Sequence, residues 1–315
     1  MSKRSPIAGI FAAGAAILGG LAALTSGVSS TPRPGSHGRT RNPGTGNVRL
    51  RGQGVYVTSY ARESPDEMAD KLADAGLTWV CLPTVLDWRS GGGNVADDLP
   101  RYADAVRKVG ITPWAWGWPE PRGTASKVSG PAEWYSVTAA AARAGGCQGI
   151  LVNAENSRGE RGWDRSDPID VQDAKDLAAA LRRDGWPWIL SSYPVPAWHG
   201  HFPWDAFLSQ GPVLGSPQVY SFERYGDDFG ARGVKAYQDR GFAGVVPSFG
   251  SEQSAGSDLR DRSPADQMLY EVRATLDRVP LDAIVWWSWS ALRRDATRRA
   301  ATRQLARDFY GRGAA

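Results

Sequence analysis

Residues 132–155 read AEWYSVTAAAARAGGCQGILVNAE, and this stretch predicts one helix followed by one strand. Apolar residues recur at helical spacing over Ala132–Ala144, and the small residues that follow indicate a turn. Gly149–Glu155 is then a short apolar run that ends in polar residues, which is typical of a buried parallel strand. The stretch therefore predicts one unit of an α/β fold, with the helix outside a parallel sheet.

The same alternation recurs along the chain from Val48. The predicted strands are Gly54–Tyr60, Trp79–Leu86, Ile111–Trp118, Gly149–Glu155, Trp188–Tyr193, Gly215–Phe222, Gly244–Phe249 and Ala283–Ser290. The predicted helices include Ser64–Ala75, Leu99–Val109, Ala132–Ala144, Val171–Asp184 and Ser263–Arg278. Several begin at Ser-Pro, and several end at a glycine, namely Gly76, Gly110, Gly145 and Gly185. Eight such alternations predict one α/β domain over residues 48–315, a (β/α)8 TIM barrel.

A doubly wound open sheet is the main alternative fold. It would require a Gly-rich phosphate loop after the first strand. Tyr60–Ser64 is not such a loop, and Gly91–Gly93 lacks the G-x-G-x-x-G pattern in the right context. The sequence therefore favours the closed barrel.

The first 47 residues have a different composition from the rest. Lys3 and Arg4 precede an uncharged apolar stretch, Ile7–Val28, which is long enough to span a bilayer. We therefore expect residues 1–28 to be a signal peptide or membrane anchor and residues 29–47 to be a flexible basic linker. The protein would be secreted or anchored outside the cell, with membrane association through residues 7–28. The alternative is a Gly/Ala-rich segment of a phage virion protein.

Composition excludes some classes of partner. The net charge is only +4, and much of the excess lies in the N-terminal tract and the last helix, so no nucleic-acid partner is expected. The 14 tryptophans are typical of sugar-binding clefts, although tryptophan is also a large core residue. Cys81 and Cys147 lie in or beside apolar runs and are expected to be buried free thiols. His199 and His201 lack a third ligand, so neither a metal nor a cofactor is expected.

The end of the fourth strand carries the clearest chemical signal. Leu151, Asn153 and Glu155 share one parity, so their side chains point to one face of the strand. If that face is inward, a carboxyl and an amide project together at the barrel mouth, where TIM-barrel enzymes have their active sites. A carboxyl among tryptophan rings has a raised pKa and suits a general acid. The structural alternative is a salt bridge from Glu155 to Arg158 or Arg161.

Other polar and aromatic residues stand at or after the remaining strand ends. Trp114, Trp116 and Trp118 alternate along the third strand, and we expect the first two to pack and Trp118 to form a platform. The first strand offers Ser59 and Tyr60. The candidate substrate-binding residues are Trp118, Glu120, Tyr193, Gln218, Glu223, Trp287 and Trp289. Tyr220, Trp118 and Trp289 are expected to line the same cleft as Glu155.

This arrangement resembles chitinase-like (family 18) and lysozyme-like (family 25) glycoside hydrolases. In those families the fourth strand ends in Asp-x-Glu, where the Glu is the acid, and the matching residues are Asn153-Ala154-Glu155. The chitinase-like sixth strand carries a Tyr in a Met/Gln-x-Tyr-Asp setting, and Gln218-Val219-Tyr220-Ser221 matches it in part. The resemblance implies that the Tyr220 hydroxyl holds an N-acetyl group and that Trp287 or Trp289 forms the floor of the sugar site.

The chain departs from the resemblance at Asn153 and Ser221, which stand where those families have Asp. In the chitinase-like mechanism the substrate's acetamide is the nucleophile and an Asp orients it. An ordinary two-carboxylate mechanism would instead use Glu120, Glu223 or Glu252 as the partner of Glu155.

Two functions follow as hypotheses. The first is hydrolysis of a glycan that contains N-acetylhexosamine, such as peptidoglycan, with Glu155 as general acid and Asn153 and Tyr220 as its catalytic partners. The second is a non-catalytic carbohydrate-binding or structural barrel of a cell surface or virion. A phosphate-handling barrel is a third possibility, although Ser248–Ser251 matches a phosphate loop only faintly.

Overall fold

The computed structural model describes residues 49–60, 63–85, 95–122, 130–155, 162–165, 167–220, 222–251 and 262–310. The predicted signal or anchor and the linker lie outside these residues. So do Arg158, Arg161, Ser221 and Glu252, as does the side chain of Glu223. Among the helices in the described ranges, none is both long enough and apolar enough to cross a membrane.

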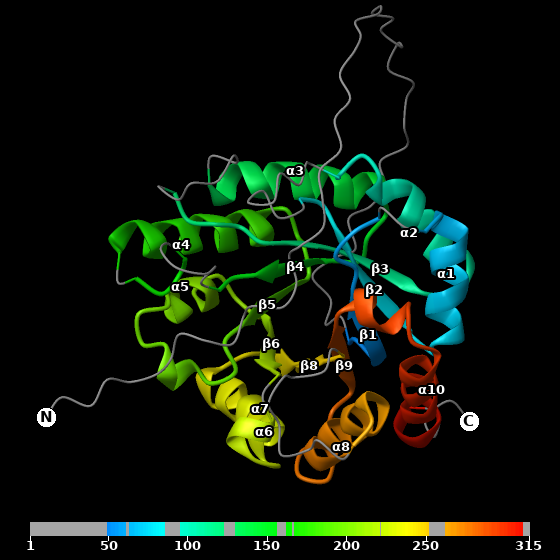
Figure 1. The fold of residues 1–315 in the computed structure, drawn as a ribbon. Coiled ribbons are helices and arrows are strands. Elements are labelled where there is room, and N and C mark those ends of the chain that lie inside the picture. Colours follow the sequence, from blue (N-terminus) through cyan, green and yellow to red (C-terminus); the bar gives the residue numbers. More distant parts are fainter. Residues whose placement is uncertain are drawn as a thin grey trace, which may run out of the picture. The chain divides into compact units, whose positions relative to one another are not determined.

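The strands form a closed parallel barrel (Figure 1). They are β1 (Gly52–Tyr56), β2 (Trp79–Pro83), β3 (Thr112–Gly117), β4 (Ile150–Asn153), β5 (Trp188–Ser192), β6 (Leu214–Val219), β7 (Gly244–Val245), β8 (Ser248–Gly250) and β9 (Ala283–Trp287). Their order is β5-β4-β3-β2-β1-β9-β8-β6-β7, and pairing of β5 with β6 closes the ring. The predicted (β/α)8 TIM barrel is confirmed.

Segments β7 and β8 together make the seventh strand. Both pair with β6, and the break between them falls at Val246 and Pro247. Proline has no backbone N–H to give to the ladder. Its carbonyl still accepts from the Val285 nitrogen at 3.0 Å, so the barrel stays closed across the break.

The helices surround the strands in Figure 1. They are α1 (Pro65–Asp74), α2 (Leu99–Lys108), α3 (Pro131–Ala144), α4 (Pro168–Arg183), α5 (Trp204–Leu208), α6 (Phe222–Tyr225), α7 (Phe229–Arg240), α8 (Pro264–Leu276), α9 (Trp289–Leu292) and α10 (Ala296–Leu305), with short turns η2 (Pro196–Trp198) and η3 (Ala306–Tyr310). The Ser-Pro starts are confirmed, because the hydroxyls of Ser64 and Ser263 each accept from a backbone N–H of the first helical turn at 3.2 Å. After α3 the left-handed residue is Gly146, with φ +57°, rather than Gly145.

Large aromatic side chains pack with smaller apolar ones inside the barrel. Trp79 and Trp114 have ring centroids 6.5 Å apart, and both are almost fully buried. Glycines make room for them: a Cβ on Gly54 would lie 2.2 Å from the Trp79 ring, and one on Gly149 would lie 2.3 Å from Trp114. A second and larger apolar layer lies between the strands and the helices. The lower barrel is therefore a packed core, and a ligand has room only at its ends.

The two cysteines are buried free thiols, as predicted. Cys81 belongs to the apolar layer inside the barrel, and Cys147 to the layer outside it. Burial raises the pKa of Cys147 to about 12, which makes this thiol a poor nucleophile near neutral pH.

Candidate active site

Glu155 follows β4 at the carboxyl end of the barrel. Leu151 and Asn153 precede it with the same parity, and both are buried. Leu151 belongs to the apolar layer inside the barrel, so this face of β4 points inward. Oε1 of Glu155 accepts two hydrogen bonds, from Nε1 of Trp118 and from Nδ2 of Asn153, each 3.1 Å long. The carboxyl is thus held between an indole and an amide.

Burial raises the pKa of Glu155 above its usual value. Hydrogen bonds from Trp118 and Asn153 act against this rise, and so does the nearby Gln218 amide, because these groups stabilise the carboxylate. All three partners are neutral, and they oppose burial without reversing its effect. The site therefore favours a protonated carboxyl to a higher pH than an exposed glutamate would allow, which suits a general acid.

A hydrogen-bonded chain runs from Asn153 to the next strands. Nε2 of Gln218, on β6, donates to Oδ1 of Asn153 at 2.8 Å and to Oγ of Ser191, on β5, at 3.3 Å. Asn153, Gln218 and Ser191 are all buried. Gln218, expected from the sequence to bind substrate, thus uses its amide N–H groups inside the protein.

Tyr220 lies just beyond β6, beside the same network. Its hydroxyl shares a hydrogen bond of 2.9 Å with Ser248 on β8. Burial raises the pKa of Tyr220 well above its usual value, and the nearby Tyr56 and Glu155 raise it further. The phenol therefore stays protonated and can donate a hydrogen bond to a ligand.

Four aromatic rings form a cluster that includes Trp118, whose indole bonds Glu155. Trp118 lies 4.9 Å from Trp116 and 5.7 Å from Trp287, measured between ring centroids, and Tyr56 lies 5.2 Å from Trp287. Trp116 and Tyr56 are buried, whereas Trp118 and Trp287 are half-buried. Trp116 packs, as predicted, whereas the role of Trp118 as a platform stays a prediction. Trp118 and Trp287 form the accessible aromatic wall beside the carboxyl.

Tyr56 was missed by the sequence analysis. Its hydroxyl lies near those of Ser191 and Ser216, although it makes no hydrogen bond of normal geometry with a described residue. It interacts electrostatically with Glu155, and burial raises its pKa above the usual value. Gly54 and Tyr56 are two residues apart on β1 and so face the same side of the strand. This alternation was the signal in the sequence that could have placed Tyr56 inside the barrel. Tyr60, which the sequence offered at this strand end, instead stacks on Tyr102, with ring centroids 4.2 Å apart.

The predicted position of Trp289 was wrong. It was expected to line the cleft with Glu155, but it is almost fully buried in the apolar layer outside the barrel. Its Nε1 donates to Oε2 of Glu63 at 2.8 Å. Strand β9 ends at Trp287, and α9 begins two residues later, so strand alternation no longer governs the direction of the Trp289 side chain.

Two further predicted residues, Tyr193 and Glu120, follow strands β5 and β3. Tyr193 stacks on His199 with ring centroids 3.5 Å apart, and Nδ1 of His199 pairs with Oδ2 of Asp164 at 2.8 Å. Glu120 is buried in the loop after β3. In the described ranges, no three His, Cys, Asp or Glu side chains are grouped so as to hold a metal ion.

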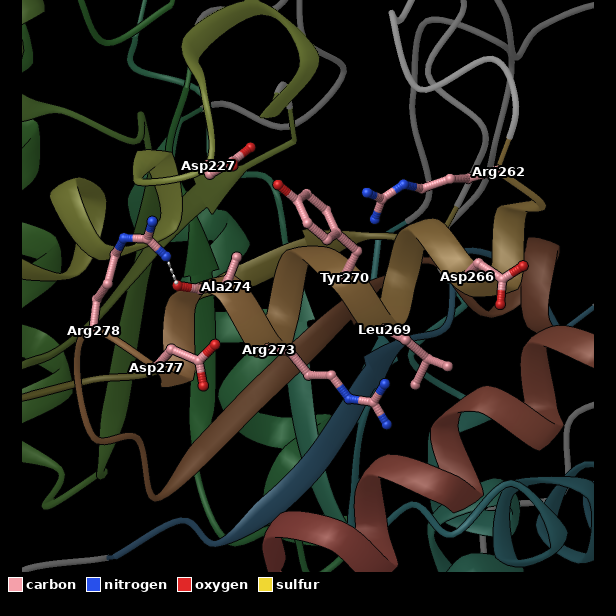
Figure 2. Close-up of a pocket in the computed structure, with 9 residues that line it drawn as sticks. All are labelled: Asp227, Arg262, Asp266, Leu269, Tyr270, Arg273, Ala274, Asp277 and Arg278. Carbon is pink, nitrogen blue, oxygen red and sulfur yellow. Dashed lines mark hydrogen bonds between the residues drawn. The ribbon is translucent and has the colours of Figure 1, made fainter.

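A surface hollow lies elsewhere, along the outer side of α8 (Figure 2). Its charged side chains are largely paired: Arg273 binds Asp308 at 3.0 Å, and Arg262 lies 3.8 Å from the Tyr270 ring centroid. Arg278 donates to the Ala274 carbonyl at 2.7 Å. This hollow is a solvated helix surface and is separate from the strand ends where Glu155 lies.

Comparisons with known proteins give a fold and no family. No family model matches the chain, and no curated protein sequence matches it. Solved structures do match. A family 5 xyloglucanase from Paenibacillus pabuli is 11% identical, with a TM-score of 0.54 over 82% of this chain and 98% of that one. A group IV chitinase from Ostrinia furnacalis is 9% identical, with a TM-score of 0.53 over 82% and 99%.

A protein of another kind matches about as well. A xylose isomerase domain-containing protein from Salmonella typhimurium is 10% identical, with a TM-score of 0.51 over 83% of this chain and 97% of that one. At such identities the likeness shows the TIM-barrel fold alone. It does not single out family 18 or family 25.

Proposed function

We propose that this chain is a glycoside hydrolase in which Glu155 is the general acid. One observation carries the proposal: a carboxyl with a raised pKa lies at the carboxyl end of a TIM barrel, and its hydrogen-bond donors among the described residues are neutral, one of them the half-buried Trp118. Cleavage of a glycosidic bond requires a proton on the leaving oxygen, and a carboxyl that stays protonated near neutral pH supplies it.

The substrate class is a glycan that contains N-acetylhexosamine, such as peptidoglycan. Glu155 transfers its proton to the glycosidic oxygen as the bond to the sugar's anomeric carbon breaks. The carbonyl oxygen of the substrate's own acetamide attacks that carbon, and water later opens the resulting ring. Asn153 bonds Glu155, and Tyr220 is near enough to interact with it electrostatically, so an amide and a hydroxyl near the carboxyl are available to bind an acetamide. The faces of Trp118 and Trp287 suit a pyranose ring.

Non-catalytic carbohydrate binding is the second candidate, and the Asn153 geometry favours it. The resemblance has an aspartate here, whose charge would stabilise the positive ring that forms when the acetamide attacks. Asn153 is neutral, and its amide already bonds Glu155 and Gln218. Such a barrel would bind the same glycan without cleaving it. Residues 1–28 stay a predicted signal peptide or membrane anchor, with phage virion as the alternative location.

A panel of substrates separates the two candidates. Full-length protein is incubated with peptidoglycan, with N-acetylglucosamine oligomers and with cello-oligosaccharides, which lack acetamides, and products are identified by mass. We expect cleavage of the acetamido substrates alone. Quenching of tryptophan fluorescence without any product would favour the binding barrel. Cleavage of cello-oligosaccharides would overturn the acetamide mechanism, and an absence of both products and quenching would reject a sugar site.

A further inference from the structure

A continuous chain of hydrogen bonds crosses three neighbouring strands and ends on Glu155. Ser191 on β5 accepts from Gln218 on β6, which donates to Asn153 on β4, which donates to Glu155. The first three side chains are buried, and none of them is ionisable near neutral pH. Because these three side chains are buried, a substrate has little access to them. Their effect on the site is therefore exerted through Glu155.

Gln218 determines which way the Asn153 amide faces. The two ends of an amide have the same shape, and their hydrogen-bond partners assign the oxygen and the nitrogen. Because Nε2 of Gln218 lies 2.8 Å from Asn153, the asparagine places its oxygen there and turns its NH2 group toward Glu155. If both amides were turned over, Asn153 would present an acceptor to Glu155, and Ser191 would have to donate to the Gln218 oxygen.

The Trp118 indole shows which of these two arrangements is present. An indole N–H can only donate, and it points at Oε1 of Glu155, the same oxygen that Asn153 contacts. With the amides turned over, Oε1 would carry a proton for Asn153 while also facing the indole donor. With the amides as observed, Oε1 accepts from both neighbours and needs no proton.

We propose that Gln218 and Ser191 are positioning residues that fix the Asn153 amide as a donor, so that Asn153 and Trp118 occupy one oxygen of Glu155 and the acidic proton resides on the other. The inference rests on the proposed function for its catalytic meaning, but the hydrogen-bond arrangement can be tested without any substrate. It also gives Asn153 a role that an aspartate could not fill, since a carboxylate has no N–H to donate.

The hydrogen-bond donors limit how far burial raises the pKa of Glu155. Burial favours the protonated form of Glu155, and every donor to its carboxylate reduces that preference. Among the described residues, the titratable groups recorded as interacting with Glu155 are the phenols of Tyr56, Tyr220 and Tyr237, from β1, the end of β6 and α7. Burial raises the pKa of all three phenols, so none of them changes charge near neutral pH. The amide and indole donors are thus the main control on this acid.

The test removes the Gln218 amide and follows the Glu155 carboxyl directly. The full chain is labelled with ¹³C at glutamate carboxyls, and Glu155→Gln identifies the resonance. Gln218→Met keeps the side-chain length but removes the stabilising effect of the Gln218 amide on Glu155 and also frees the Asn153 amide to turn, so we expect the pKa of Glu155 to rise by about one unit. Gln267→Met is the matched control, because Gln267 is a buried glutamine on α8 that bonds Glu271. It should lower the melting temperature similarly and leave Glu155 unchanged.

A measurement on the unmodified protein covers the case in which Gln218→Met does not fold. The side-chain NH2 signals of Asn153 and Gln218 should shift with the midpoint of Glu155, with the larger shift at Asn153. An unchanged Glu155 pKa in Gln218→Met, or an Asn153 signal that ignores the titration, would overturn the positioning role. These readouts need no turnover, so they separate failure of this inference from failure of the proposed hydrolysis.

Discussion

Replacing Glu155 by glutamine should make the protein more stable as the pH rises, relative to the wild type. Burial raises the pKa of Glu155 in the folded protein above its value in the unfolded chain. The stability that the protonated carboxyl contributes is therefore fully present below the unfolded pKa, and it is lost as the pH rises through the folded pKa. The loss is about 1.4 kcal/mol for each unit that separates the two pKa values. Glutamine stays neutral and escapes this loss.

Urea unfolding measured from about pH 3 to about pH 8 tests this reasoning. The difference in free energy of unfolding, variant minus wild type, should be flat at the acid end and rise with pH to a plateau. Glu63→Gln is the matched control, since Glu63 also accepts an indole N–H but pairs with Lys71 at 2.8 Å. Removing that ion pair should lower stability at neutral pH. The reasoning would be refuted if the free energies of unfolding of Glu155→Gln and wild type changed in parallel with pH, or if Glu155→Gln were less stable than wild type near neutral pH. Glu155 would then be a structural anchor.

Three further substitutions probe the barrel and its mouth. Trp118→Phe keeps a ring but removes one donor from Glu155, so the pKa of Glu155 should rise by about one unit, seen by ¹³C titration and as an upward move of the alkaline limb of activity; an unchanged pKa would show that the indole donor is unimportant. Trp289→Phe loses the bond to Glu63 and should cost about 1 kcal/mol of unfolding free energy while sugar affinity, measured by calorimetry, stays the same; a large drop in affinity would return this residue to the site. Gly54→Ala puts a methyl 2.2 Å from the indole that β2 contributes to the barrel, and it should destabilise by about 1–3 kcal/mol in urea unfolding; a neutral result would mean that the core is loosely packed.

Much of the barrel could be predicted from local patterns. Each strand is a short apolar run between turn residues, and pairs such as Ser64-Pro65 mark helix starts by local hydrogen bonding that needs no tertiary context. The parity of Leu151, Asn153 and Glu155 also followed from strand geometry alone. The break in the seventh strand at Pro247 was harder to predict from the sequence, because pairing with the neighbouring strands on both sides holds this segment in the barrel.

Contacts between strands account for the parts of the site that sequence could not supply. Gln218 was expected to bind substrate, but its partners Asn153 and Ser191 come from β4 and β5, and only the closed barrel brings them within bonding distance. The prediction for Trp289 was wrong for a local reason. Strand β9 ends at Trp287, so the alternation of side chains along the strand stops before Trp289. Tyr56 lies inside the barrel by the parity of β1, and its importance depends on the charge of Glu155 from another strand.

Turnover by Glu155→Gln is the most direct test of the proposed hydrolysis. The variant keeps the shape of the side chain and the acceptor for Trp118 and Asn153, but it cannot give a proton to the leaving oxygen. On an acetamido glycan that the wild type cleaves, we expect kcat to fall by about 10²–10⁴-fold, with glycan affinity retained and with Glu63→Gln as active as the wild type. Turnover by Glu155→Gln equal to that of the wild type would contradict the assignment of Glu155 as the general acid.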